Sequence, residues 1–164
     1  MNGLRRRIAE VQVAFMLLTR LPAGRLWGGA PELAAAKWAF PLTGLVVGGS
    51  FAGVYITMSI LALPASLAAI LALGVSVMMT GGLHEDGLAD CADGFGGGQT
   101  KDQKLAIMRD SRVGSYGVLA LVLVIAARMM ALATLPATAQ SLILLISLAT
   151  VSYTHLTLPT ICSV

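Results

Sequence analysis

Apolar residues form two long blocks separated by one polar segment. Residues 38–83 contain no Asp, Glu, Lys or Arg over 46 consecutive positions, and from residue 113 to 164 the only such residue is Arg128. Each block is longer than the roughly 20 residues that cross a bilayer as a helix. Pro64 interrupts the first block and Pro136 the second. The pattern therefore predicts membrane helices at about 40–63, 65–83 and 115–135, and a partial one at 141–151.

The composition indicates that lipid is part of the solvent. Hydrophobic residues make up 57% of the 164 residues, charged residues only 12%, and the mean hydropathy is +0.83. Because soluble domains carry about 25% charged residues, this chain has too little polar surface to cover a globule in water. Disorder is disfavoured by the same numbers. The predicted fold class is all-α, a polytopic transmembrane helical protein.

The charged residues predict the topology. Residues 1–37 form a basic N-terminal arm, in which an interfacial helix is expected rather than a cleaved signal peptide. This arm and the segment 84–113 together hold ten of the eleven basic residues. An even number of crossings separates them, so the positive-inside rule places both in the cytoplasm. The expected organisation is the arm, then a membrane region at 38–151 whose acidic, glycine-rich segment 84–113 is a cytosolic loop.

Acidic residues at helical spacing open the polar segment. If the second span continues as a helix, Asp86, Asp90 and Asp93 lie at about 0°, 40° and −20° around its axis, with Glu85 on the flank. Carboxylates this close repel one another unless a cation neutralises them. A hard divalent ion such as Mg²⁺, which keeps waters and substrate phosphates among its ligands, would do so. We therefore predict a metal and phosphate site in this segment.

A solvated helix end is the structural alternative for these acids. Acids favour helix N-termini, but on this reading they follow the C-terminal end of the apolar span, where the helix dipole disfavours them. Gly81, Gly82 and Gly87 also weaken a helix, which indicates that close backbone approach is needed here. Both observations favour a functional interpretation.

Other residues of the segment are candidates for phosphate binding. Gly96 and Gly97 could turn N–H groups toward a phosphate, although a plain linker fits as well. Arg109 and Arg112, at the end of a short expected surface helix, can bracket a phosphate through forked donors. Contact with anionic lipid is the alternative for basic residues at this position.

Two further residues are notable because of their positions. His84 fits a metal ligand, a proton carrier or an ordinary polar residue at the membrane boundary. Arg128 lies in the middle of the third span, where a cation costs about 2.5–3.5 kcal/mol. A carboxylate partner or a substrate phosphate would explain it, whereas snorkelling is weak this far from either end.

Several motifs resemble those of one family. The run GLHEDGLADCADGFGGG at 82–98 and the run IMRDSRVG at 107–114 closely resemble the signature of the cobalamin synthase (adenosylcobinamide-GDP ribazoletransferase) family. FMLLTRLP at 15–22 and FPLTGL at 40–45 are similar to its N-terminal motifs. The resemblance implies a multi-pass enzyme of the inner (plasma) membrane. Such an enzyme joins adenosylcobinamide-GDP to α-ribazole or its 5′-phosphate, releases GMP and requires Mg²⁺.

Roles can then be proposed for the candidate residues. We expect Asp86, Asp90 and Asp93, assisted by Glu85, to hold one or two Mg²⁺ ions. An acid of this cluster or His84 would accept the proton of the ribazole hydroxyl, which makes these residues the catalytic set. Substrate phosphate would be bound by five other residues: Arg109, Arg112, Arg128, Gly96 and Gly97.

Two alternatives remain open. CDP-alcohol phosphotransferases have similarly spaced aspartates, but their Ala-Arg after the first Asp-Gly is missing here. A cation-binding transporter is the non-enzyme alternative, although such sites usually lie near the membrane midplane on broken helices. The expected partners are the two substrates and the lipid bilayer, with no nucleic acid, and a homo-oligomer stays open. Residues 152–164 match nothing expected of the family and are interpreted as a non-native tail on a C-terminally truncated member.

Overall fold

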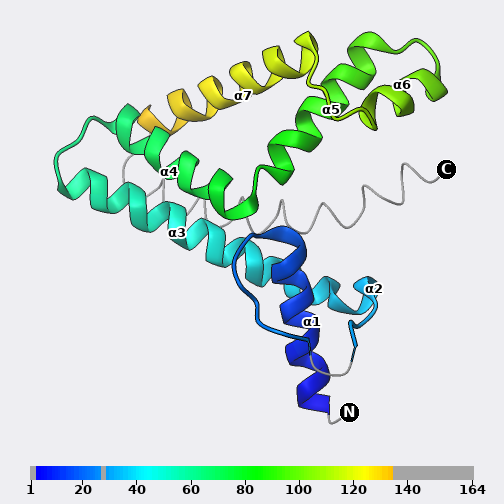
Figure 1. Cartoon of the computed structure of the whole chain (residues 1–164). Coiled ribbons are helices and arrows are strands. Elements are labelled where there is room, and N and C mark those ends of the chain that lie inside the picture. The colour runs from blue at the N-terminus through cyan, green and yellow to red at the C-terminus, as the bar shows by residue number, and fades with distance from the viewer. Residues whose placement is uncertain (1–2, 27–28, 135–164) are drawn as a thin grey trace. The chain divides into compact units, whose positions relative to one another are not determined.

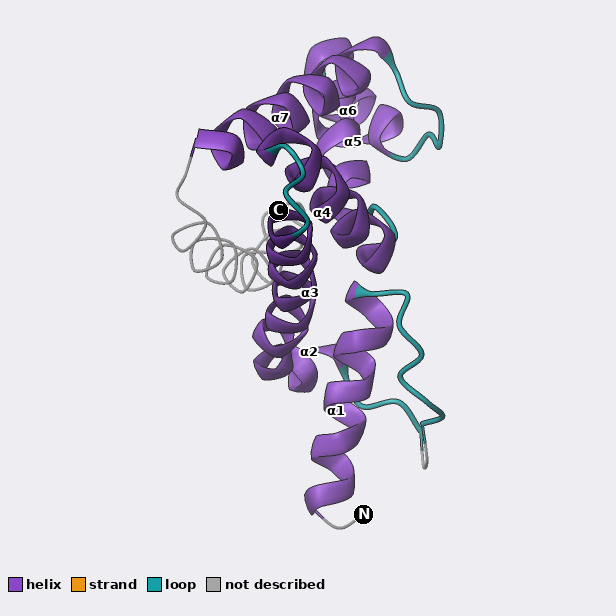
Figure 2. Cartoon of the chain, turned by 90° about the vertical axis from the view of Figure 1, so that its left-hand side faces the viewer, coloured by secondary structure: helices purple, strands orange, loops and turns teal. Residues whose placement is uncertain are grey.

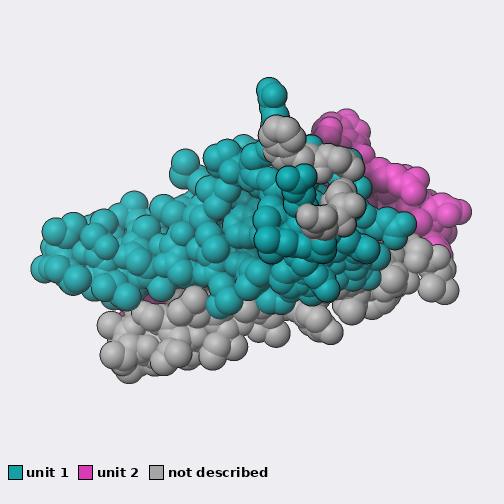
Figure 3. Space-filling model, turned by 90° about the horizontal axis from the view of Figure 1, so that it is seen from below, with its two compact units in different colours: residues 1–81, 135–164 teal, residues 82–134 magenta. Residues whose placement is uncertain are grey.

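The computed structural model describes residues 3–26 and 29–134 (Figure 1). The described residues form helices and loops without a strand (Figure 2), which confirms the all-α fold class. The chain divides into two compact units, residues 1–81 with 135–164, and residues 82–134 (Figure 3). The partial span expected at 141–151 and the tail expected at 152–164 lie outside the described residues.

The first unit begins with α1 (Gly3–Leu18), which packs against the start of the first long apolar helix. The short α2 (Leu33–Ala36) and the 3-10 helix η1 (Lys37–Ala39) lead directly into α3 (Phe40–Ile60). A small apolar core joins these elements, and its buried members are Ala14, Leu18, Ala36, Ala39 and Phe40. The N-terminal arm is therefore a folded part of the first unit.

Glu10 is a buried carboxylate that joins α1 to η1. Its side chain is 2% exposed and accepts hydrogen bonds from Trp38 Nε1 at 2.7 Å, Arg7 Nη1 at 3.0 Å and Arg6 Nε at 3.2 Å. The guanidinium of Arg7 also lies 5.3 Å from the ring centroid of Trp38. The hydrogen bond from Trp38, opposed by burial and reinforced by both arginines, holds the pKa of Glu10 below its ordinary value.

α3 and α4 (Ala65–Thr80) form a helical hairpin whose connection contains Pro64. α4 buries Ala68, Ala69 and Ala72 completely, and small side chains of this kind allow apolar helices to approach closely. Hydroxyl groups in α3 donate to backbone carbonyls four residues earlier. One example is Thr57, whose hydroxyl lies 2.7 Å from the carbonyl oxygen of Gly53. The hydroxyl groups of Ser50, Thr57 and Ser59 are thereby satisfied within an apolar helix.

Two helical segments are long and apolar enough to cross a membrane, Leu33–Ile60 and Ser115–Thr134. A third crossing is counted if α4 and α5 (Leu83–Gly97) together form one interrupted span. The second segment is α7 (Ser115–Thr134). Only 11% of an 18-residue apolar stretch of this helix is buried. The described residues thus confirm a protein with two or three candidate membrane-spanning helices.

The second unit contains α5, α6 (Lys101–Met108) and α7, with α5 packed against both other helices. A capping box between Thr100 and Gln103 begins α6, because each side chain accepts a backbone N–H that the helix leaves without a partner. The expected surface helix is therefore present, and it ends at Met108, before Arg109 and Arg112. Most of the segment expected as a cytosolic loop is helical.

The expectation of one continuous helix from the second span into the acidic residues is wrong. α4 ends at Thr80, and Gly81 and Gly82 have φ values of +69° and +75°, in the left-handed region that favours glycine. Because a new helix begins at Leu83, Glu85 and Asp86 lie in its first turn, where the helix dipole favours acids. The dipole argument against a structural role for these acids therefore does not hold.

Replacing Glu10 by Gln should lower the unfolding midpoint in detergent by several degrees, because the amide removes one acceptor of charge-assisted hydrogen bonds. The folded-state pKa of Glu10 is lowered, so its ionic stabilisation is complete above the unfolded-state value and is lost as the pH falls through the folded-state value. The difference between wild type and Glu10→Gln should therefore be constant near neutral pH and shrink below the ordinary glutamate value of 4.5. The matched control is Glu32→Gln, at an exposed position. Equal effects of the two changes would contradict the anchoring role of Glu10.

Candidate functional site in the acidic helix and its partners

α5 carries all four predicted acidic residues, and the structure gives them different surroundings. Asp86 is exposed, Glu85 and Asp90 are half-buried, and Asp93 is 8% exposed. Within the described residues, no group of three or more His, Cys, Asp or Glu side chains is arranged to hold a metal ion. Asp86 and Asp90 lie about one helical turn apart, so their side chains are neighbours on one face of α5.

Asp93 binds the N-terminal end of α7. Its Oδ2 accepts the backbone N–H of Gly114 at 2.7 Å, and its Oδ1 accepts the backbone N–H of Gly117 at 2.8 Å. Gly114 precedes the first residue of α7, and Gly117 is the third residue of the helix, so both N–H groups lack partners within the helix. Asp93 therefore performs from a distant helix the function of an N-cap side chain, with its negative charge at the positive end of the helix dipole.

Both glycines are required by this contact. A Cβ atom added at Gly114 or at Gly117 would collide with the carboxylate of Asp93. At Gly117 it would also lie 3.1 Å from the Cβ of Ala89 on α5. The first turn of α7 can therefore approach α5 this closely only without side chains at these two positions.

Arg128 pairs with Glu85 at the other end of the contact between α5 and α7. Its Nη1 lies 3.6 Å from Glu85 Oε1, and the two side chains are 48% and 20% exposed, respectively. The second carboxylate oxygen of Glu85 is buried and has no hydrogen-bond partner among the described residues. A carboxylate partner was one of the two explanations for Arg128, and the structure provides it.

The pairing shows how far α5 extends along α7. Arg128 follows the first residue of α7 by 13 positions, which is about 20 Å at the rise of an α-helix. α5 therefore runs antiparallel along α7, from the Asp93 contact at one end to the Glu85 contact at the other. The beginning of α5 lies beside the middle of a candidate membrane span.

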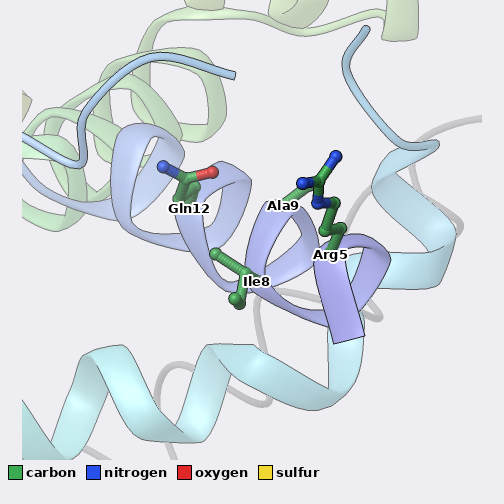
Figure 4. Close-up of a pocket in the computed structure, with 4 residues that line it drawn as sticks. All are labelled: Arg5, Ile8, Ala9 and Gln12. Carbon is green, nitrogen blue, oxygen red and sulfur yellow. The ribbon is translucent and has the colours of Figure 1, made fainter. Parts of the chain in front are cut away.

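The structure brings three of the predicted site residues around one hollow. A cavity of about 240 Å³ between α5, α6 and α7 is lined by Asp93, Gly97 and Arg112, together with Ile107, Ser115 and Tyr116. A separate pocket of about 570 Å³ lies along α1 (Figure 4), and its described lining residues, Arg5, Ile8, Ala9 and Gln12, include none of the predicted site.

The predicted phosphate-binding residues differ in how far their donor groups are already engaged. Arg112 forms a forked ion pair with Asp110, with its Nη2 2.6 Å from Oδ2, and these hydrogen bonds lower the pKa of Asp110. Arg109 is exposed at the end of α6. Gly96 and Gly97 belong to the last turn of α5, where the α-helical pattern engages their N–H groups. These two glycines can present N–H groups to a phosphate only if that turn opens.

Three residues near these elements were not predicted from the sequence: Arg20, Ser115 and Tyr116. The backbone N–H of Arg20 donates to the carbonyl of Met79 at 2.7 Å, and its side chain occupies the space that a Cβ at Gly81 would need. Its position in the FMLLTRLP run could have indicated this residue. Ser115 and Tyr116 directly follow the IMRDSRVG run at 107–114, and both line the cavity. His84 is half-buried in the first turn of α5, and its role as a proton carrier stays a prediction.

Comparison with known proteins identifies the family. The sequence model described as cobalamin-5-phosphate synthase matches residues 10–163, so the chain belongs to this family. The match extends into the residues interpreted as a non-native tail, and that interpretation stays a prediction. No solved structure matches the chain significantly.

Several similar curated proteins are named adenosylcobinamide-GDP ribazoletransferase. The adenosylcobinamide-GDP ribazoletransferase of Bradyrhizobium diazoefficiens is 50% identical over 133 residues, which cover 80% of this chain and 51% of that protein. The proteins of the same name from Mesorhizobium japonicum and Xanthobacter autotrophicus are 45% and 49% identical, over 87% and 81% of this chain and 55% and 52% of their own lengths. The chain thus spans about half the length of these curated relatives.

Proposed function

We propose that this chain takes part in the reaction for which its relatives are named. In that reaction a hydroxyl group of α-ribazole, or of its 5′-phosphate, attacks the phosphorus nearer to the cobinamide in adenosylcobinamide-GDP. The bond from that phosphorus to the leaving GMP breaks, and the hydroxyl proton passes to a base. The observation that carries the proposal is the 50% identity to a ribazoletransferase over 133 residues, a region that takes up 80% of this chain.

The acids of α5 fit a magnesium ion that is shared with the substrate. Mg²⁺ is commonly bound by one or two carboxylates, with waters and substrate phosphates as the remaining ligands. The side chains of Asp86 and Asp90 have no hydrogen bond to another described residue, and Glu85 has a buried carboxylate oxygen without one. Asp86 and Asp90 would hold the ion, which would neutralise charge on the diphosphate when bound, whereas Glu85 is paired with Arg128. Asp93 was also predicted as a metal ligand, but both of its carboxylate oxygens already accept backbone N–H groups.

Basic side chains near the cavity supply the phosphate contacts in this proposal. Arg109 is exposed and available, whereas Arg112 would exchange its ion pair with Asp110 for a substrate phosphate. An arginine can make this exchange with little loss because its forked donors match carboxylate and phosphate oxygens equally well. We retain His84 or an acid of α5 as the base for the ribazole hydroxyl.

We further propose that α4 and α5 form one interrupted membrane crossing in the inner (plasma) membrane. The N-terminal arm and the connection around α6 then face the cytoplasm, as the positive-inside rule requires. Support comes from the contact of Glu85 with the middle of α7, since a surface loop would not reach that depth. The beginning of the acidic helix is then within the bilayer and its end is at the cytoplasmic surface.

The interrupted helix is also a feature of cation transporters, which place their sites at helix breaks. Membership of the synthase family favours the enzyme.

Replacing Asp86 or Asp90 by Asn should lower GMP release from adenosylcobinamide-GDP and α-ribazole by about 100-fold or more, because each change removes an anionic metal ligand. A higher Mg²⁺ concentration should rescue the rate only in part. The measurement is GMP formation by membranes that contain the chain. Asp102→Asn, in the exposed first turn of α6, is the matched control and should keep the wild-type rate. Absence of metal-dependent GMP release from the wild type would refute the proposed function.

Cysteines introduced at Gln99, Leu83 and Ala65 should distinguish an interrupted crossing from a surface loop. With Cys91 and Cys162 replaced by Ser, a membrane-impermeant maleimide should label position 99 only from the cytoplasmic side and position 65 only from the other side. Position 83 should react roughly tenfold more slowly than position 99, because the thiolate that reacts is disfavoured in the bilayer. Equally fast labelling of positions 83 and 99 would show that the acidic helix lies at the membrane surface and would contradict the interrupted crossing.

A further inference from the structure

One face of α5 carries a stripe of three acids, Asp86, Asp90 and Asp93, which differ in what they contact. Asp93 is nearly buried and uses both carboxylate oxygens on backbone N–H groups of α7. Asp86 is exposed at the other end of the stripe, and Asp90 is half-buried between them. A residue with both oxygens engaged and little solvent access is poorly placed to bind a hydrated cation that arrives with a substrate.

We propose that Asp93, Gly114 and Gly117 form a clamp that positions the first turn of α7, and that Asp93 is a positioning residue rather than a ligand of the metal. This inference rests on the proposed function and assigns a different task to one of its acids. The clamp fixes Gly114, and with it the short link from Arg112 to Ser115, against the end of α5. The cavity-lining side chains of Arg112, Ser115 and Tyr116 are then held at a constant distance from the free acids.

The two glycines support this role independently of the acid. Each one places its backbone N–H on the carboxylate, and each lacks the side chain that would displace the carboxylate. A metal ligand would need neither glycine. Removal of the clamp by a change on α7, without any change in the acids, should therefore reproduce the effect of a change at Asp93.

The stability of the metal-free protein gives opposite predictions for the two roles. Asp93→Asn replaces one acceptor oxygen by an NH₂ group that faces a backbone N–H, so the clamp predicts a fall of about 5 °C in the unfolding midpoint in detergent with EDTA. A ligand whose main metal-free interaction is repulsion from Asp86 and Asp90 would instead leave the midpoint unchanged or raise it. Asp86→Asn and Asp90→Asn should show that second behaviour.

A matched pair of glycine changes completes the experiment. Gly117→Ala should lower the metal-free midpoint as Asp93→Asn does, because its Cβ meets the carboxylate. Gly87→Ala on α5 has open space around the added Cβ and should leave the midpoint unchanged or raise it. If Asp93→Asn yields no folded protein, Gly117→Ala decides alone, and an unchanged midpoint for Gly117→Ala overturns the clamp.

The dependence of GMP release on Mg²⁺ separates positioning from ligation in the active protein. The clamp predicts that Asp93→Asn lowers kcat by about tenfold or more while the Mg²⁺ concentration for half-maximal rate stays within twofold of the wild type. Asp86→Asn and Asp90→Asn should raise that concentration. A higher Mg²⁺ requirement in Asp93→Asn, together with an unchanged or raised metal-free midpoint, would make Asp93 a ligand and refute the proposal. If the wild type releases no GMP, the proposed function fails, and the metal-free midpoints still decide the clamp.

Discussion

The carboxylate of Asp93, with two N–H groups of the α7 N-terminus bound to it, is the interaction on which the second unit depends. A helix that begins beside other helices has N–H groups without partners, and leaving them buried and unbonded is costly. Asp93 satisfies two of them and places negative charge where the helix dipole is positive. Because the donors belong to glycines, α5 and α7 come close enough for the ion pair between Glu85 and Arg128 to form further along.

This arrangement accounts for the distribution of acids on α5. Glu85 and Asp93 lie at the two ends of the α5–α7 contact, where each has a partner on α7. Asp86 and Asp90 lie between them in sequence, and their side chains have no hydrogen bond to another described residue. A helix with four acids would repel itself if all were free, and pairing two of them leaves only a small cluster for a cation to neutralise. One helix therefore carries two acids that contact α7 and two acids that are available to bind a cation.

The sequence predicted the helices that have a strong apolar pattern and the short α6. Spacing at 3.6 residues per turn also sufficed to place the acids of α5 on one helix. The break at Gly81 and Gly82 was not predictable from hydrophobicity, because two left-handed glycines differ from two helical ones only in backbone conformation. The partner of Arg128 could be expected as a type of group but not named, since Glu85 is far away in the sequence and reaches it only through the antiparallel packing of α5 on α7.

The role of Asp93 was hidden for a related reason. By spacing alone it belongs to the same stripe as Asp86 and Asp90, and only the tertiary contact with α7 distinguishes it. Gly114, the last residue of the run at 107–114, carried a signal that could have been used, because a glycine next to a helix start often permits a close approach. Gly96 and Gly97, in contrast, were given a phosphate role that their helical position makes harder to fulfil.

Amide hydrogen exchange at Gly114 and Gly117 tests the central interaction most directly. Glycine-selective ¹⁵N labelling of the metal-free protein in detergent would resolve these amides, with Gly87 in the body of α5 as an internal reference. First-turn amides of a helix ordinarily exchange quickly because they lack partners. The account predicts slow exchange at Gly114 and Gly117 in the wild type and fast exchange at both in Asp93→Asn, while Gly87 stays unchanged. Fast exchange at both glycines in the wild type, or slow exchange that Asp93→Asn does not alter, would contradict it.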